Sequence, residues 1–150
     1  MRKWALTVMV KPHVDVADGT FRGQIQPASP RSWFESYGEM INRYADLAQR
    51  AGAELFCVGT ELTTMAECTD DFRGVIDGVR SRFDGELTYG ANLVDEAERV
   101  EFWDDLDLIG IDAYMPLSTP DAEPSVEWNG AAGGGIDVPG IDLPEIDLPS

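Results

Sequence analysis

Short apolar runs recur along the chain as far as residue 114, and each is rich in β-forming residues. They are too brief for helices, and they cover Trp4–Val10, Glu54–Thr60, Leu87–Ala91 and Leu108–Ile111. Each run is therefore predicted to be a strand. The second run turns polar at Thr60 and Glu61. A carboxylate at the mouth of a buried strand is costly to desolvate, yet α/β folds keep their reactive groups at such positions.

Between these runs the apolar residues recur at helical spacing. Ser29-Pro30 has the form of a helix N-cap followed by proline in the first turn, and Gly52 is a suitable C-terminal cap. The apolar stripe of this helix is Trp33, Tyr37, Met40, Ile41, Tyr44, Leu47 and Ala48. A second helix is predicted from Thr69, with a buried stripe of Phe72, Val75, Ile76 and Val79. A short third helix is predicted over about 95–104.

The order of these elements, βαβαβαβ, favours an α/β fold with parallel strands and helices packed outside the sheet. Parallel strands present their C-terminal ends on one side, so the polar residues that end the four strands should converge there. This convergence is typical of the catalytic face of a TIM barrel. The residues concerned are His13 and Asp15, Thr60 and Glu61, Asn92, and Asp112 with Tyr114.

Beyond Tyr114 the pattern ends. Residues 130–135 are a Gly/Ala cluster, and a five-residue unit with proline in fourth place is then repeated three times up to Ser150. Proline at every fifth position forbids a regular helix or a central strand. We therefore expect one folded domain over residues 1–127 and a disordered, acidic, low-complexity tail over 128–150.

Composition limits the partners. The formal net charge is -17 and the pI about 4.1, so binding to nucleic-acid phosphates or to anionic membranes is not expected. No run is long enough to cross a membrane, and no cleavage site follows the short apolar N-terminal segment. The expected location is cytoplasmic by default. Two cysteines make no disulfide framework.

Several blocks of the chain resemble family 113 glycoside hydrolases, which are β-mannanase-like TIM-barrel enzymes of a large retaining clan. The likeness covers about Arg2–Leu117. It is carried by Val8–Asp15 with Asp18–Gly23, by Tyr44–Ala48, by Phe56–Leu62, by Leu87–Asn92 and by Phe102–Tyr114. The resemblance implies that the four strands are barrel strands three to six, so that the chain is part of a (β/α)8 barrel. A full barrel needs about 250 residues.

The same resemblance implies a function. In that clan the acid/base glutamate ends strand four, the place that Glu61 takes, and the nucleophile ends strand seven, which has no counterpart in this chain. The implied activity is retaining hydrolysis of a β-linked glycan such as β-mannan, without a cofactor. Retention needs two carboxyl groups about 5–5.5 Å apart, so the isolated chain is expected to be inactive. Thr60 departs from the clan, which usually has asparagine before the acid/base, and Phe21 stands where tryptophan is usual.

Other polar residues are candidates for binding the sugar. His13, Asp15, Asn92 and Asp112 could hydrogen-bond sugar hydroxyls, and Phe21 and Tyr114 could stack on a sugar face. Each also has a structural interpretation, because strand-end residues often bridge or stabilise loops.

Two other functions stay open at this point. One is a degenerate or non-catalytic carbohydrate-binding fragment. The other is a metal-dependent hydrolase with His13, Asp15 and Glu61 as ligands, although one histidine is a thin set of ligands. If the chain holds only barrel strands three to six, its first and last strands are open edges, through which it is expected to self-associate.

Overall fold

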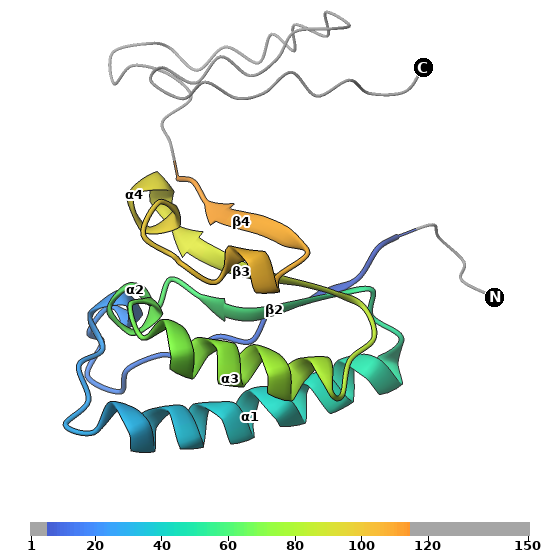
Figure 1. Cartoon of the computed structure of the whole chain (residues 1–150), viewed down its shortest axis with the longest axis horizontal. Coiled ribbons are helices and arrows are strands. Elements are labelled where there is room, and N and C mark those ends of the chain that lie inside the picture. Colours follow the sequence, from blue (N-terminus) through green and yellow to red (C-terminus); the bar gives the residue numbers. More distant parts are fainter. Residues whose placement is uncertain (1–5, 115–150) are drawn as a thin grey trace, which may run out of the picture. The chain divides into compact units, whose positions relative to one another are not determined.

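Four parallel strands form one sheet in the order β1-β2-β3-β4 (Figure 1). The computed structural model describes residues 6–114, so the expected tail over 128–150 lies outside the described residues. The strands are β1 (Met9–Val10), β2 (Leu55–Thr60), β3 (Glu86–Asn92) and β4 (Leu108–Asp112). The predicted α/β class and parallel sheet are therefore confirmed, and β1 and β4 are the edges of the described sheet.

Two long helices lie side by side on one face of the sheet, as Figure 1 shows. Helix α1 (Pro30–Ala51) begins at its predicted cap, where the Ser32 N–H donates to the Ser29 hydroxyl at 3.3 Å. It ends at Gly52, whose φ of 70° is the left-handed conformation that glycine adopts without a Cβ penalty. Helix α3 (Thr69–Arg80) begins at the predicted residue and buries the predicted stripe. Local capping and periodicity thus account for both helices.

An aromatic core fills the space between these helices and the sheet. Phe72 of α3 stacks on Phe102, with ring centroids 4.8 Å apart, and meets Tyr89 of β3 edge to face at 5.6 Å. The Tyr37 hydroxyl of α1 donates to the Val58 carbonyl at 2.8 Å, which satisfies a buried polar group. All five of these residues are less than 10% exposed. The core therefore fixes β2 and β3 most firmly, and the candidate site lies at the ends of these strands.

A β-bulge in β2 changes which side chains face the helices. Cys57 pairs with Thr88, but Thr60 pairs with Gly90, so β2 has one residue more than β3 over this stretch. An extra residue interrupts the alternation of faces. As a result Gly59 faces the ring of Tyr89 on the helix side, while Thr60 lies on the opposite face beside Asp112. The bulge is what turns Thr60 toward the candidate site.

The first strand is much shorter than predicted. Only Met9 and Val10 of the predicted run pair as a strand, and residues 6–8 do not. The Val8 N–H donates instead to the carboxylate of Glu54 at 2.9 Å. The Val8 carbonyl still accepts from the backbone of Glu54 and Leu55. The physical reason is that β1 has a neighbour on one side only, so apolar composition alone does not extend its ladder.

The connection between β3 and β4 also differs from the prediction of one helix over 95–104. It contains α4 (Leu93–Ala97) and a 3-10 turn, η2 (Trp103–Asp105). The chain leaves the helical path between them because Phe102 has to reach the ring of Phe72. The Trp103 indole N–H then donates to the Ala97 carbonyl at 2.8 Å, at the end of α4.

Two short elements border the site and were not predicted. They are the 3-10 turn η1 (Arg22–Gln24) and the helix α2 (Thr63–Ala66). The Thr64 hydroxyl of α2 donates to the Ile25 carbonyl at 2.5 Å, just after η1. This bond joins the loop after β1 to the turn after β2.

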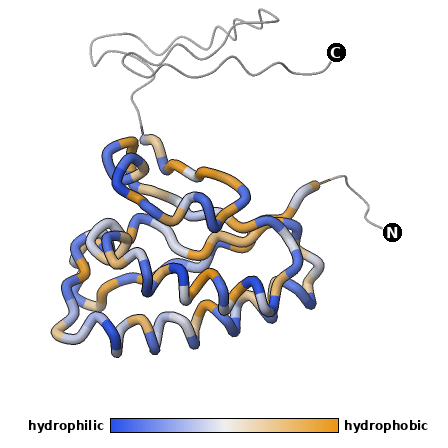
Figure 2. Tube along the Cα trace, viewed as in Figure 1, coloured by the Kyte–Doolittle hydropathy of each residue, from blue (hydrophilic) through white to orange (hydrophobic). Residues whose placement is uncertain are grey.

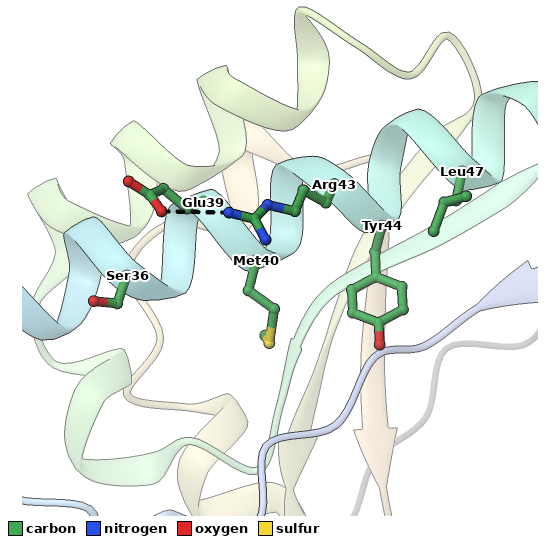
Figure 3. A pocket seen from close by; sticks show the side chains of 6 residues that line it. All are labelled: Ser36, Glu39, Met40, Arg43, Tyr44 and Leu47. Carbon is green, nitrogen blue, oxygen red and sulfur yellow. Dashed lines mark ion pairs between the residues drawn. The ribbon is translucent and has the colours of Figure 1, made fainter.

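Apolar side chains remain exposed at both edges of the sheet and on part of α1. Figure 2 shows orange segments along β4. All seven residues of the predicted apolar stripe lie in α1, but Tyr44 and Leu47 are 44% and 50% exposed and line a groove (Figure 3). At the edges the exposed residues are Leu6, Val8 and Met9 near β1, and Leu108, Ile109 and Ile111 in β4. None of the helices over 6–114 is both long and apolar enough to cross a membrane.

Candidate active site

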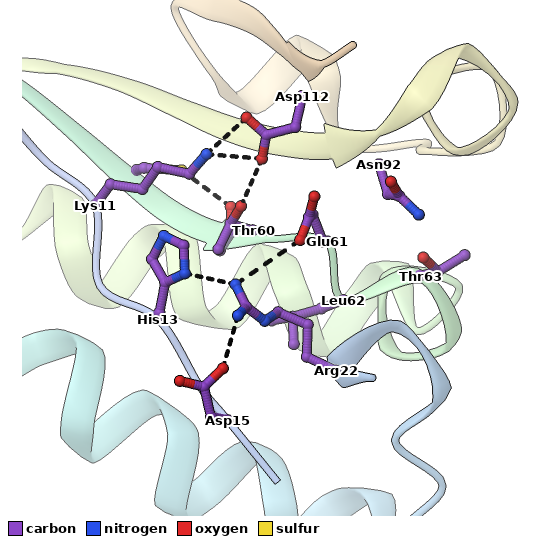
Figure 4. A network of polar contacts seen from close by, with 12 residues as sticks. Lys11, His13, Asp15, Arg22, Thr60, Glu61, Leu62, Thr63, Asn92 and Asp112 are labelled. Carbon is purple, nitrogen blue, oxygen red and sulfur yellow. Dashed lines mark hydrogen bonds and ion pairs between the residues drawn. The ribbon is translucent and has the colours of Figure 1, made fainter. Parts of the chain in front are cut away.

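The polar residues that end the strands converge, as the sequence predicts. Figure 4 shows side chains from the ends of all four strands pointing toward one region. The structure brings together seven of the eight predicted site residues, with Phe21 at the border of the group. The seven are His13, Asp15, Thr60, Glu61, Asn92, Asp112 and Tyr114.

Lys11 and Asp112 form an ion pair that joins the two edges of the sheet. The Lys11 ammonium donates to both carboxylate oxygens of Asp112 at 2.7 Å. The Thr60 hydroxyl donates to the same carboxylate at 2.9 Å. Residues from β2 and β4 and the residue directly after β1 thus form one polar cluster, and the Asp112 side chain is held from two directions.

This ion pair requires a curved sheet. Strands lie about 4.8 Å apart, so β1 and β4 of a flat four-stranded sheet would be separated by roughly 14 Å, beyond the reach of a lysine side chain. Gly90 of β3, which lies between them, makes room. A Cβ at Gly90 would lie 3.3 Å from the Lys11 nitrogen, 3.2 Å from Asp112 and 3.1 Å from the Thr60 hydroxyl. Glycine at this position lets the charged groups meet across the concave face.

The environment of Asp112 favours its charged form. Partial burial by itself would raise the pKa of this carboxyl. The hydrogen bonds from Lys11 and Thr60, together with the Lys11 charge, outweigh burial and lower the pKa below its ordinary value. Asp112 is therefore an anion paired with a cation, which suits a structural strap or a fixed hydrogen-bond acceptor.

A second cluster centres on Arg22 of η1. Its guanidinium contacts the His13 ring and donates to the Asp15 carboxylate at 2.6 Å. The same group lies 3.8 Å from the Glu61 carboxylate. The Arg22 side chain is 16% exposed, whereas Asp15 is 79% exposed. Arg22 therefore ties the loop after β1 to the residue that ends β2, and it brings a positive charge beside Glu61.

Glu61 itself is held in an unusual backbone conformation. Its φ is 55°, in the left-handed region that non-glycine residues seldom adopt. Its N–H donates to the Gly90 carbonyl at 2.7 Å, and the residue is only 7% exposed. Gly23 of η1 packs so close that a Cβ there would lie 3.1 Å from the Glu61 carbonyl. Backbone contacts from two sides therefore fix the direction of the Glu61 side chain.

The remaining predicted residues lie around this carboxylate. The Tyr114 side chain is 76% exposed and sits beside Glu61, whose charge raises the pKa of the tyrosine hydroxyl. Asn92 lies at the end of β3 (Figure 4). The ring of Phe21 packs over Gly23 and is 42% exposed. A carboxylate, an amide and two exposed aromatic rings at one place are suited to a ligand with many hydroxyl groups.

Sequence reasoning missed three charged residues of this region. Lys11 directly follows the first strand, as His13 and Asp15 do, so its place in the chain carried the same signal. Nothing in the local sequence distinguishes Arg22 from the other arginines. Glu96 has the appearance of a solvated helix residue in the sequence, yet it is only 2% exposed in the fold.

The three ligands of the alternative metal-hydrolase hypothesis are arranged around a cation instead of facing an open centre. Arg22 lies between His13, Asp15 and Glu61, in contact with each (Figure 4). Among residues 6–114, no group of three or more His, Cys, Asp or Glu side chains is arranged to hold a metal ion. The donor set of the metal-hydrolase hypothesis is thus engaged by a guanidinium.

Comparisons with known proteins agree with this geometry. The sequence profile of Glycoside Hydrolase Family 113 matches residues 1–130. Among solved structures, the family 113 β-mannanase AaManA from Alicyclobacillus acidocaldarius, in complex with ManMIm, is 42% identical and superposes with a TM-score of 0.71. Two further structures of family 113 β-1,4-mannanase, one of them described as a complex, are each 32% identical with a TM-score of 0.69. A search of curated proteins finds no significant match.

The solved structures also show how much of the barrel is present. Each similarity covers 74% of this chain but 38% of the solved protein. The chain therefore spans well under half the length of the mannanases that it resembles. The described strands correspond to a part of a TIM barrel.

Proposed function

Because the chain belongs to Glycoside Hydrolase Family 113, we propose that it carries the acid/base half of a retaining β-mannan hydrolase site. The observation that supports this most directly is the placement of Glu61. It directly follows β2, is 7% exposed, and is fixed by backbone contacts among groups that can bind a sugar. The mannanases that resemble the chain support β-mannan as the substrate class.

In this proposal Glu61 acts twice. Its carboxylic acid first protonates the glycosidic oxygen as that bond breaks, while a second carboxylate forms a bond to the anomeric carbon. The ionised Glu61 then removes a proton from the water that hydrolyses the glycosyl intermediate. The resemblance to the retaining clan assigns the second carboxylate to barrel strand seven, beyond the four described strands, at about 5–5.5 Å from Glu61.

The surrounding residues bind and orient. Arg22, held by His13 and Asp15, places a cation 3.8 Å from Glu61 and can stabilise the carboxylate after proton transfer. Lys11, Thr60 and Asp112 form a polar strap across the concave face of the sheet. Together with Asn92, this strap offers hydrogen bonds to sugar hydroxyls. Phe21 and Tyr114 offer exposed rings for stacking.

The test is substitution of Glu61 in a complete barrel. Residues 6–114 can replace the matching segment of AaManA, which is 42% identical. We expect Glu61→Gln to lower the rate of mannan hydrolysis by about 10²–10⁴-fold. The loss should be smaller on aryl β-mannosides with good leaving groups, which need little protonation. Glu35→Gln, on an exposed part of α1, is the matched control.

Undiminished hydrolysis of mannan by the Glu61→Gln barrel would remove Glu61 from the mechanism. The chain alone forms the second arm of this experiment, and we expect it to show no turnover because half of the carboxylate pair is absent. Saturable binding of mannooligosaccharides without turnover, even after the barrel is completed, would instead support a non-catalytic carbohydrate-binding fragment. Activity lost to a chelator and restored by a divalent cation would support the metal-dependent alternative.

A further inference from the structure

A buried carboxylate lies behind the candidate site. Glu96 of α4 is 2% exposed, and its partners are neutral donors. The Tyr89 hydroxyl donates to one oxygen at 2.6 Å. The Thr63 hydroxyl and the Asn92 N–H donate to the other, at 2.6 and 3.0 Å. A buried carboxylate with three good donors is satisfied, and each donor belongs to a segment that borders the site.

Tyr89 carries this connection on to Glu61. Its hydroxyl oxygen accepts the N–H of Leu62, the residue after Glu61, at 2.9 Å. Burial and the neighbouring Glu96 charge raise the pKa of the Tyr89 hydroxyl, so it stays protonated and donates to Glu96. The Glu96 carboxylate therefore reaches the turn after β2 by two routes, through Tyr89 to Leu62 and directly to Thr63.

Both turns that Glu96 joins contain a residue in the left-handed region. Glu61 has a φ of 55°, and Leu93, directly after Asn92, has a φ of 60°. Such conformations persist in non-glycine residues only where the surroundings hold them. In each turn an adjoining N–H is bound by this network, at Leu62 in one turn and at Asn92 in the other.

We propose that Glu96 is a positioning residue that fixes the Glu61 turn relative to Asn92, through Tyr89 and Thr63. It touches no reacting atom; it holds the backbone from which Glu61 projects. This inference rests on the proposed function, since the direction of Glu61 matters for catalysis only if Glu61 is the acid/base. The placement itself can be tested without turnover.

The experiment uses isotopically labelled full chain and two readouts by NMR. The first is hydrogen exchange at the Leu62 amide, relative to the Ile76 amide in the core of α3. The second is the pH titration of the Glu61 side-chain carboxyl carbon. Glu96→Gln replaces one acceptor oxygen by an NH2 donor, so that either Tyr89 or the pair of Thr63 and Asn92 loses its acceptor. Tyr89→Phe keeps the Glu96 carboxylate but cuts the route to Leu62, so it separates positioning from a simple effect of charge.

We expect both variants to speed exchange at Leu62 by about ten- to a hundredfold over Ile76, the effect of losing a buried bond to a charged group. Both should also displace the titration midpoint of Glu61. Val79→Ala opens a cavity at the C-terminal end of α3. It is the control for a general loss of stability. It should speed exchange at Leu62 and Ile76 alike and leave the Glu61 midpoint unchanged.

A milder pair keeps the test decisive if those variants unfold. Thr63→Val removes the hydroxyl that donates to Glu96, and Thr63→Ser restores it. Faster exchange at Leu62 in Thr63→Val and wild-type exchange in Thr63→Ser would support positioning. Equal acceleration at Leu62 and Ile76 in every variant, or an unchanged Glu61 midpoint, would overturn it and leave Glu96 a structural residue. Failure of the proposed function would show in the hydrolysis assay of the complete barrel, independently of these readouts.

Discussion

At the scale of single residues, the site is organised by charge. Glu61 lies 3.8 Å from the Arg22 guanidinium and beside the Tyr114 hydroxyl, and both neighbours come from chain segments distant in sequence. Glu61 is a buried anion or acid within reach of a cation and a phenol. A nearby charge changes the pKa of a titratable group, so removing the Glu61 charge should change the pKa of a neighbouring residue.

Tyr114 provides a direct test of this arrangement. The Glu61 charge is the main cause of its raised pKa. We expect Glu61→Gln to lower the pKa of Tyr114 toward the ordinary value of about 10, measured by NMR titration of its ring carbon. Glu67→Gln, an exposed residue after α2, should leave the Tyr114 titration as it is. An unmoved midpoint in the Glu61 variant would place Tyr114 away from the candidate acid/base.

At the scale of elements, the sheet is strapped on its concave face. Lys11 and Asp112 bind across β2 and β3, with Gly90 leaving the space between them. This ion pair forms because the sheet is curved, and it adds one contact that joins the two edge segments across the concave face. That curvature sets how closely the strand ends, and therefore the site residues, converge.

The strap predicts a specific dependence on pH. The folded-state pKa of Asp112 lies below the unfolded value of about 3.9. The stability that Asp112 contributes is therefore present above about pH 4 and is lost as the pH falls through its folded-state pKa. We expect Asp112→Asn to be less stable than the wild type at pH 7, and to lose less stability below pH 4.

Urea unfolding at a series of pH values measures this difference. Asp77→Asn, on the exposed side of α3, is the matched control and should keep the acid dependence of the wild type. If the free energy of unfolding falls equally steeply below pH 4 in Asp112→Asn and in the wild type, protonation of Asp112 is not linked to folding.

At the scale of the whole molecule, two features oppose each other. The edges of the described sheet carry exposed Ile109 and Ile111 on β4, and Val8 and Met9 near β1. Exposed edge strands are templates for pairing with another chain. The net charge of -17, in contrast, makes copies repel each other.

We expect the chain to self-associate through its sheet edges as salt rises, because screening shortens the range of the repulsion to about 10 Å at 0.1 M ionic strength. Light scattering of the full chain across a salt series measures the effect. Ile109→Lys places a charge on the β4 edge and should keep the chain monomeric at higher salt. Leu47→Lys, on the groove of α1, should not.

If Leu47→Lys, and not Ile109→Lys, kept the chain monomeric at higher salt, association would be assigned to the groove of α1. A monodisperse monomer at every salt concentration would show that the exposed edges do not pair.

The sequence by itself determined the elements that depend on local physics. The α1 caps at Ser29 and Gly52, the start of α3 at Thr69 and the three longer strands follow from periodicity, capping and composition, which act over a few residues. The parallel order of the strands then implies that their polar ends meet. For that reason Thr60, Glu61 and Asp112 could be named as neighbours before any fold was known.

Only the tertiary structure decided what those residues touch. The bulge that turns Thr60, the positive φ of Glu61, and the cations of Arg22 and Lys11 depend on contacts between distant segments. Glu96 is the strongest case, because a helix-surface acid by sequence becomes a buried acceptor once β3 and α2 close over it. Such contacts depend on packing across the sheet, and no local pattern of residue types encodes them.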